Sequence, residues 1–221
     1  MKIVRDAVLA AAITLALVTS LKAASPAVSL PDPEVDDPLA ASSSKVSLVL
    51  AGGCFWGIEE LYQHVRGVTD AVSGYSGGSA TNANYELVSL GTTGHAESVR
   101  VTYDPSTITY GQLLKIFFAV AHDATQKGGQ GPDVGPQYRS VIFFADEHQQ
   151  KIAAAYVAQL TAARVLKRSI TTQVVPLTAF YEAESYHQDY ASHHPTQPYI
   201  AINDLPKVDA LKKQFPQVYV R

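Results

Sequence analysis

Cys54 is the side chain of this sequence best suited to covalent chemistry. It is the only cysteine among 221 residues, and it is followed by Phe55 and the only tryptophan, Trp56. The apolar run Val46–Ala51 predicts a buried strand, and the apolar spacing over residues 58–65 predicts a helix. Cys54 is therefore expected at a strand-to-helix turn, where a helix N-terminus lowers the pKa of a thiol. The alternative is a small buried hydrophobe in a turn.

A reactive cysteine needs acid–base partners, and the sequence offers several. Glu97 begins an apparent strand; if it faces a dry pocket, burial raises the pKa of its carboxyl into the range of a general acid. A pair formed by Cys54 and His187 would instead suit a hydrolase or an acyltransferase. Asp189 and His193 lie one helical turn apart, but two ligands are weak evidence for a metal, and we expect none.

Composition excludes several classes of function. The chain has 47% hydrophobic residues, enough for a packed core, and a net charge of −3 without a basic stripe, which predicts neither nucleic-acid binding nor attraction to an anionic membrane surface. One cysteine rules out an internal disulfide and a multi-cysteine metal site. The glycine-rich stretch 74–82 lacks the lysine of a phosphate-binding loop, so we expect no nucleotide there. No coiled-coil or amphipathic interface is evident, and we expect a monomer.

The first residues have the pattern of an export signal. Lys2 and Arg5 precede an apolar run, Ala7–Val18, which is too short to cross a bilayer comfortably. Residues 1–24 are therefore expected to be a signal peptide, and the protein to be periplasmic or secreted without stable membrane insertion after cleavage. An uncleaved anchor is the alternative, because the cleavage site is imperfect.

The rest of the chain divides into a linker and one domain. Residues 25–44 are rich in proline, acids and serine, and we expect them to be disordered. The catalytic domain is expected over residues 45–221, with a long loop at 123–137 that is typical of a functional segment. Expected strands lie at 46–51, 68–75, 96–103, 138–144 and 170–175, and expected helices at 58–65, 110–120, 147–166, 182–192 and 208–215. This pattern favours an α+β two-layer sandwich, a mixed β-sheet with packed helices.

Five stretches, taken together and in order, resemble the peptide methionine sulfoxide reductases of the A type. They are GCFWG at 53–57, GYSGG at 74–78, GHAE at 94–97, GPDVGPQYRS at 131–140 and FYEAE at 180–184. The resemblance runs from about Leu48 to the C-terminus. It implies a ferredoxin-like core and an enzyme that reduces methionine-S-sulfoxide, free or in proteins, as repair after oxidative damage.

The resemblance also implies roles for individual residues. Cys54 matches the nucleophile and Glu97 the acid. Tyr85 and Tyr138 match the tyrosines that hold the sulfoxide oxygen, and Asp133 matches a carboxylate that supports the site. The product would be methionine and a sulfenic acid on the cysteine. A module that binds oxidised methionine without turning it over remains an alternative.

Substrate orientation and recycling follow from the same resemblance. Phe55 and Trp56 match the aromatic walls that receive the substrate methyl group, and one sulfoxide epimer per enzyme is the general pattern. Many relatives carry a second, C-terminal cysteine, which this sequence lacks; residues 198–216 resemble the single-cysteine branch. The implied enzyme has no bound cofactor and depends on an external thiol: a thioredoxin- or glutaredoxin-like protein, or dithiothreitol in vitro.

Overall fold

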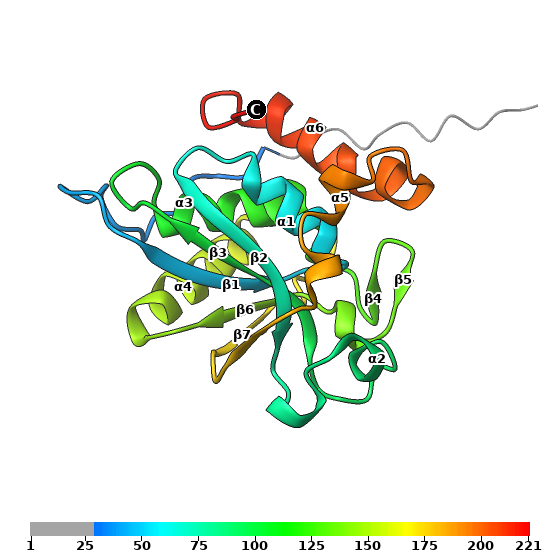
Figure 1. Ribbon diagram of the computed structural model, residues 1–221. Helices are drawn as coiled ribbons and strands as arrows, with labels where there is room; N and C mark the ends of the chain where they lie inside the picture. The colour runs from blue at the N-terminus through cyan, green and yellow to red at the C-terminus, as the bar shows by residue number, and fades with distance from the viewer. Residues whose placement is uncertain (1–28) are drawn as a thin grey trace, which may run out of the picture.

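The computed structural model describes residues 29–221, and the predicted signal peptide lies outside this range. Its centre is a mixed six-stranded sheet with the order β7-β6-β1-β3-β2-β8 (Figure 1). The strands are β1 (Val46–Ala51), β2 (Val68–Ser76), β3 (Ala96–Tyr103), β6 (Val141–Phe144), β7 (Gln173–Pro176) and β8 (Phe180–Glu182). A separate two-stranded hairpin is formed by β4 (Gly129–Gln130) and β5 (Asp133–Val134).

The helices connect these strands and cover the sheet. They are α1 (Phe55–Gln63), α2 (Tyr85–Val88), α3 (Tyr110–Ile116), α4 (Glu147–Ala163), α5 (Tyr190–His193) and α6 (Leu205–Gln214). Two π-helical segments, η2 (Phe117–Ala121) and η5 (Ile200–Asp204), extend α3 and precede α6. No helix within residues 29–221 combines the length and the apolar character needed to cross a bilayer.

The ferredoxin-like core is confirmed. The elements β1, α1, β2, β3, α3 and β6 follow one another along the chain, and their strands lie in the order β6-β1-β3-β2 with antiparallel neighbours. The helix α4 then leads to β7, which pairs in parallel with β6, as a crossover helix allows. The last strand, β8, pairs with the opposite edge, on β2.

The core lies between the sheet and the helices. Leu50 on β1, Val99 on β3 and Ile58 on α1 are fully buried in one apolar cluster, which also contains Phe117 of η2. A smaller cluster that includes Val49 occupies the other face of the sheet. Because β1 and β3 contribute side chains to both faces, they are held in register in the middle of the sheet.

Residues 29–44 do not behave as the disordered linker that their composition predicts. They lie along the domain as an N-terminal strap, in which Leu30 is only 3% exposed. The carboxylate of Asp36 accepts hydrogen bonds from the Thr109 hydroxyl at 2.5 Å and from the Gly111 N–H at 2.9 Å. An acid of the strap thus sits at the N-terminus of α3, where free amides and the helix dipole favour negative charge. Composition alone does not reveal such long-range partners.

The prediction of a helix at 182–192 is wrong. The chain instead forms β8, a 3-10 turn η4 (Ser185–His187) and the short α5. Asp189 interrupts any continuous helix because its φ is +55°, in the left-handed region. The expected strand at 138–144 begins only at Val141, since Tyr138 belongs to the 3-10 turn η3 (Pro136–Tyr138).

Replacing Asp36 with alanine should destabilise the domain. The change removes the acceptor at the start of α3, and a loss of about 1 kcal/mol of unfolding free energy is expected, as for other helix caps. Chemical denaturation of the two proteins measures this difference. Asp37→Ala is the matched control. The Asp37 carboxylate bonds to the exposed His148, and its N–H donates to the adjacent Asp36, so this substitution should change the free energy of unfolding little. Equal effects of the two substitutions would show that the strap does not cap α3.

Candidate active site

Cys54 lies at the N-cap of α1, as the sequence predicts. The turn from β1 requires glycine at position 53, because φ there is +102° and a Cβ would collide with the side chain of Gln130. Cys54 is 8% exposed and belongs to the main apolar core cluster, but it also lines a cavity of about 150 Å³.

The cavity collects side chains from five separate parts of the chain. All seven residues proposed from the sequence line it, together with one that the sequence analysis did not single out, Tyr199. The lining residues are Cys54, Phe55, Trp56, Tyr85, Glu97, Asp133, Tyr138 and Tyr199. The five parts are the start of α1 with Cys54, Phe55 and Trp56; the start of α2 with Tyr85; β3 with Glu97; the β5–η3 segment with Asp133 and Tyr138; and the segment before η5 with Tyr199.

Glu97 is a buried acid rather than a solvated one. It is 2% exposed, and its carboxyl accepts a hydrogen bond from the Phe55 N–H at 3.1 Å. Burial, together with the charges of Asp133 and Asp204, raises the pKa of Glu97 to about 8, although the Phe55 hydrogen bond opposes the rise. The carboxyl is therefore mostly protonated at neutral pH and can donate a proton.

The environment of Cys54 differs from the sequence expectation of a thiol with a lowered pKa. Burial raises the pKa of Cys54 well above its usual range, and the charges of Glu97 and Asp204 raise it further. Lys207 and a backbone hydrogen bond from Trp56 act in the opposite direction but do not compensate. The helix N-terminus is present, yet desolvation of the anion outweighs it. These surroundings favour the thiol form of Cys54 over the thiolate.

Three tyrosine hydroxyls provide neutral hydrogen-bond donors around the cavity. Burial is the first cause of the raised pKa of Tyr85, Tyr138 and Tyr199, and nearby acids add to it. The Tyr199 hydroxyl donates to Oδ2 of Asp133 at 2.5 Å, which fixes the ring and the β4–β5 hairpin together. Tyr199 belongs to the C-terminal stretch 198–216 that carries part of the family resemblance. The sequence does not show, however, that this stretch folds back onto Asp133.

His187 supports the aromatic side of the cavity through its contact with Trp56. Trp56 Nε1 donates to His187 Nδ1 at 3.2 Å, and Trp56 stacks on Tyr190 with a centroid separation of 4.0 Å and an interplanar angle of 15°. Burial lowers the pKa of His187, which favours the neutral ring that can accept this bond. Within residues 29–221 no hydrogen bond joins His187 to Cys54, so the geometry does not support the Cys–His hydrolase alternative.

Glu184 and Asp204 are two further residues that the sequence analysis did not place at the site. Glu184 accepts from the Tyr85 N–H and from the Tyr75 hydroxyl, both at 2.9 Å, and so positions the start of α2. Asp204 is fully buried and accepts from Lys207 Nζ at 2.9 Å. A Cβ at Gly57 would overlap with this ion pair, which explains why glycine stands in the first turn of α1.

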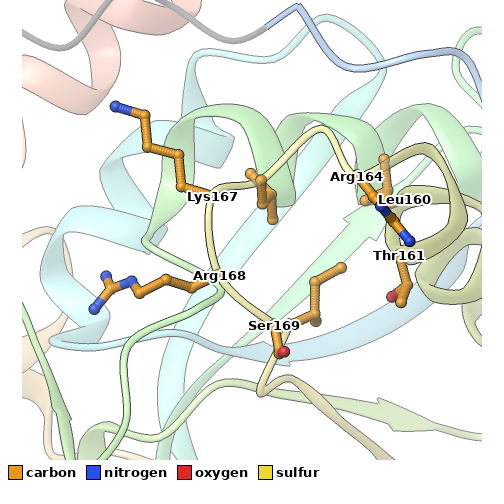
Figure 2. A pocket seen from close by; sticks show the side chains of 8 residues that line it. Leu160, Thr161, Arg164, Lys167, Arg168 and Ser169 are labelled. Atoms are coloured by element: carbon orange, nitrogen blue, oxygen red, sulfur yellow. The ribbon is translucent and has the colours of Figure 1, made fainter.

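A larger hollow, of about 540 Å³, lies elsewhere, at the loop between α4 and β7. Figure 2 shows Lys167, Arg168, Arg164 and Ser169 around it, and its lining contains neither a thiol nor a carboxylate. Within the part of the chain that the structure describes, no group of three histidine, cysteine or acidic side chains is arranged to hold a metal ion. Of these two hollows, the smaller one brings together the groups able to attack and to donate protons.

Comparison with known proteins agrees with this geometry. Residues 46–219 match the family model described as peptide methionine sulfoxide reductase. The chain belongs to the peptide methionine sulfoxide reductase family. It is an oxidoreductase that reduces methionine sulfoxide, in agreement with the resemblance stated from the sequence.

The similarity to individual members of the family extends over most of their length. The chain is 52% identical to peptide methionine sulfoxide reductase MsrA 2 of Mesorhizobium japonicum, over 83% of this chain and 93% of that protein. It is 47% identical to MsrA 2 of Synechocystis, over 84% and 88% respectively. The crystal structure of Mxr1 from Saccharomyces cerevisiae in reduced form has a TM-score of 0.65 and 32% identity, covering 72% of this chain and 94% of that one.

Glu97→Gln should make Cys54 easier to ionise. Removing a charge that raises the pKa of the thiol should shift the midpoint of thiol ionisation to lower pH. The rate of alkylation by iodoacetamide, followed by mass spectrometry from pH 7 to 11, measures the midpoint. Glu59→Gln is the control, because Glu59 is also buried, on α1, but its carboxylate accepts a hydrogen bond from the Ser73 hydroxyl and does not line the cavity. An unchanged or higher midpoint in Glu97→Gln would contradict the coupling.

Proposed function

We propose that this protein reduces methionine-S-sulfoxide, free or in oxidised proteins, through a sulfenic acid on Cys54. One observation carries the proposal: the thiol, the protonated carboxyl of Glu97 and the tyrosine hydroxyls line one small cavity with an aromatic wall. A sulfoxide presents three different groups to such a cavity, namely an apolar methyl, a hydrogen-bonding oxygen and an electrophilic sulfur.

The chemical step uses the proton that Glu97 holds. Glu97, assisted by the hydroxyls of Tyr85 and Tyr138, donates to the sulfoxide oxygen, which makes the sulfur a better electrophile. Cys54 then attacks the sulfoxide sulfur and forms an S–S bond, while the thiol proton passes to the Glu97 carboxylate and restores its acid form. The protonated oxygen moves as a hydroxyl group from the substrate sulfur to the Cys54 sulfur as the S–O and S–S bonds to the substrate break. One thiol and one sulfoxide thus give one sulfenic acid and one thioether, and the atoms balance.

Selection of one sulfoxide epimer follows from the placement of apolar and polar side chains on different sides of the cavity. Phe55 and Trp56 form an apolar side for the methyl group, whereas the hydroxyls and Glu97 form the polar side for the oxygen. With methyl and oxygen fixed on opposite sides, only one configuration at sulfur turns its electrophilic face to Cys54. We assign the S epimer to this arrangement, as the family resemblance implies.

An external thiol completes the cycle. The sequence holds no second cysteine, so a thiol from outside the chain attacks the sulfenic acid, forms a mixed disulfide and releases water. A second thiol then displaces Cys54 as the leaving group. Lys207 and the first amides of α1 favour the thiolate that leaves. A thioredoxin- or glutaredoxin-like protein suits this role in the cell, and dithiothreitol suits it in vitro.

The function is tested with a peptide that contains methionine sulfoxide as resolved epimers. With dithiothreitol, the S epimer should lose one oxygen, seen as a loss of about 16 mass units, whereas the R epimer should persist. Without a reductant, turnover should stop after one product per chain, and a 1,3-dione should label Cys54. Cys54→Ser should abolish turnover. Binding of the peptide without any product would favour the binding-module alternative instead.

Glu97→Gln should slow formation of the sulfenic acid by roughly 10²–10⁴-fold, the usual contribution of general acid–base catalysis. In the unmodified protein the single-turnover rate should fall as the pH rises through about 8, because Glu97 loses its proton there. Rapid-quench measurements between pH 6 and 9.5 follow both effects. A rate that is insensitive to pH in this range, or an unimpaired Glu97→Gln variant, would remove Glu97 from the role of acid.

We propose in addition that the protein is exported and that residues 1–24 are removed. The basic start and the apolar run of residues 7–18 support this placement. Expression of the full chain in a bacterium, followed by fractionation and mass determination of the N-terminus, tests it. The expected result is a processed chain in the periplasm or the medium. Recovery of the unprocessed chain from the membrane fraction would favour the uncleaved anchor, and recovery from the cytoplasm would reject export.

A further inference from the structure

The exposed apolar side chains of the described chain are concentrated around the mouth of the cavity. Residues 29–221 expose seven large apolar side chains, of which two, Val35 and Leu39, belong to the N-terminal strap. Each of the other five lies within five positions of a residue that lines the cavity or contacts Trp56. These five, called the apolar rim, are Leu87, Leu90, Val134, Tyr186 and Ile202. Exposed apolar groups gathered in this way mark binding surfaces.

The segments that carry the apolar rim are bonded to one another. Gln137 Nε2 donates to the Ser89 carbonyl at 3.1 Å and so joins the end of α2 to η3. The Tyr199–Asp133 hydrogen bond joins the β4–β5 hairpin to the segment that leads into η5. The Tyr85–Glu184 hydrogen bond joins α2 to the segment before Tyr186. In Figure 1, α2, the β4–β5 hairpin and α5 lie on the same side of the molecule. The segments that carry the rim residues are therefore held in fixed positions relative to one another.

The cavity itself is too small to account for binding of a polypeptide. Its volume of about 150 Å³ lies below the ~300–1,000 Å³ of typical small-molecule sites. It takes the end of one side chain and leaves the substrate backbone and the neighbouring residues outside. Those neighbours must lie over the segments that begin at Tyr85, Asp133 and Tyr199, where the rim residues are exposed.

We propose that the apolar rim binds the residues on either side of the sulfoxide in a polypeptide substrate and selects substrates with apolar flanking residues. This inference rests on the proposed function. Val134 at 83% and Ile202 at 72% exposure have most of their apolar surface available for such contacts. Apolar residues next to a methionine are accessible mainly in an unfolded or damaged chain, since they are usually buried in a folded one. The rim thus directs the enzyme to oxidised segments that have lost their packing.

The test compares three substrates at saturating dithiothreitol, so that recycling needs no protein partner. They are N-acetyl-methionine sulfoxide amide, a pentapeptide with leucine on both sides of the methionine sulfoxide, and the same pentapeptide with serine in place of both leucines. The unmodified protein should prefer the leucine peptide to the serine peptide by about tenfold in kcat/KM. A fully buried methylene group contributes about fourfold, and the rim is expected to bury a few methylene groups of the leucine side chains in part.

The variant carries Leu90→Ser, Val134→Ser and Ile202→Ser together. It should lose most of the preference for the leucine peptide through a higher KM, while kcat/KM for the small amide changes less than about twofold. Equal melting temperatures confirm that the variant is folded. Val35→Ser with Leu39→Ser is the matched control, because it removes exposed apolar groups from the strap and should keep the full preference.

Three results would overturn the inference, each in a recognisable way. The unmodified protein could show no preference between the two peptides. The rim variant could keep the preference for the leucine peptide; if assays repeated with a thioredoxin-like reductant in place of dithiothreitol then showed a higher KM for that reductant alone, the rim would be assigned to the reductant. If the unmodified protein turned over neither peptide nor the small amide, the proposed function itself would fail, and not the rim alone.

Discussion

The site depends on the burial of two acids, a thiol and a carboxyl, in one small cavity. In water Glu97 would be ionised and Cys54 largely protonated at neutral pH. Burial raises the pKa of both groups, so that both keep their protons until a substrate arrives. The reaction needs these two protons: one polarises the sulfoxide oxygen, and the other replaces it on the carboxyl. The helix N-terminus, often invoked to explain a reactive cysteine, is here a smaller influence than desolvation.

The fold serves this constraint by closing the cavity with segments that are far apart in the chain. Glu97 on β3 and Cys54 at the start of α1 are brought together by the β1–β3 pairing and by the hydrogen bond from the Phe55 N–H. The other walls are loops joined by hydrogen bonds between residues far apart in the chain, such as Tyr199 to Asp133. These bonds fix the positions of the loops without the repeating backbone pairing of a helix or a sheet.

The sequence predicts the parts of the structure that depend on local patterns. The strands 46–51 and 96–103 have the predicted bounds because alternation and apolar runs define them, and Asp146 caps α4 as expected of an N-cap residue. Glu184 and Tyr199 could not be placed at the site because their role depends on partners 99 and 66 positions away. The docking of residues 29–44 on α3 escaped prediction for the same reason. The motifs suggested the residues of the cavity; their mutual positions required the fold.

The C-terminal residues pack at a distance from the single cysteine, Cys54. The chain end is fixed beside the end of α1: the Arg66 N–H donates to the Val218 carbonyl at 2.7 Å, and Val65 pairs with Tyr219. This pairing holds the terminus against the domain at the end of α1 opposite to Cys54. In the proposed cycle the reductant must enter the same cavity as the substrate, because the sulfenic acid on Cys54 lines it together with the proposed substrate-binding residues. Substrate and reductant then alternate at this cavity, and the reduced methionine must leave before a thiol can attack Cys54.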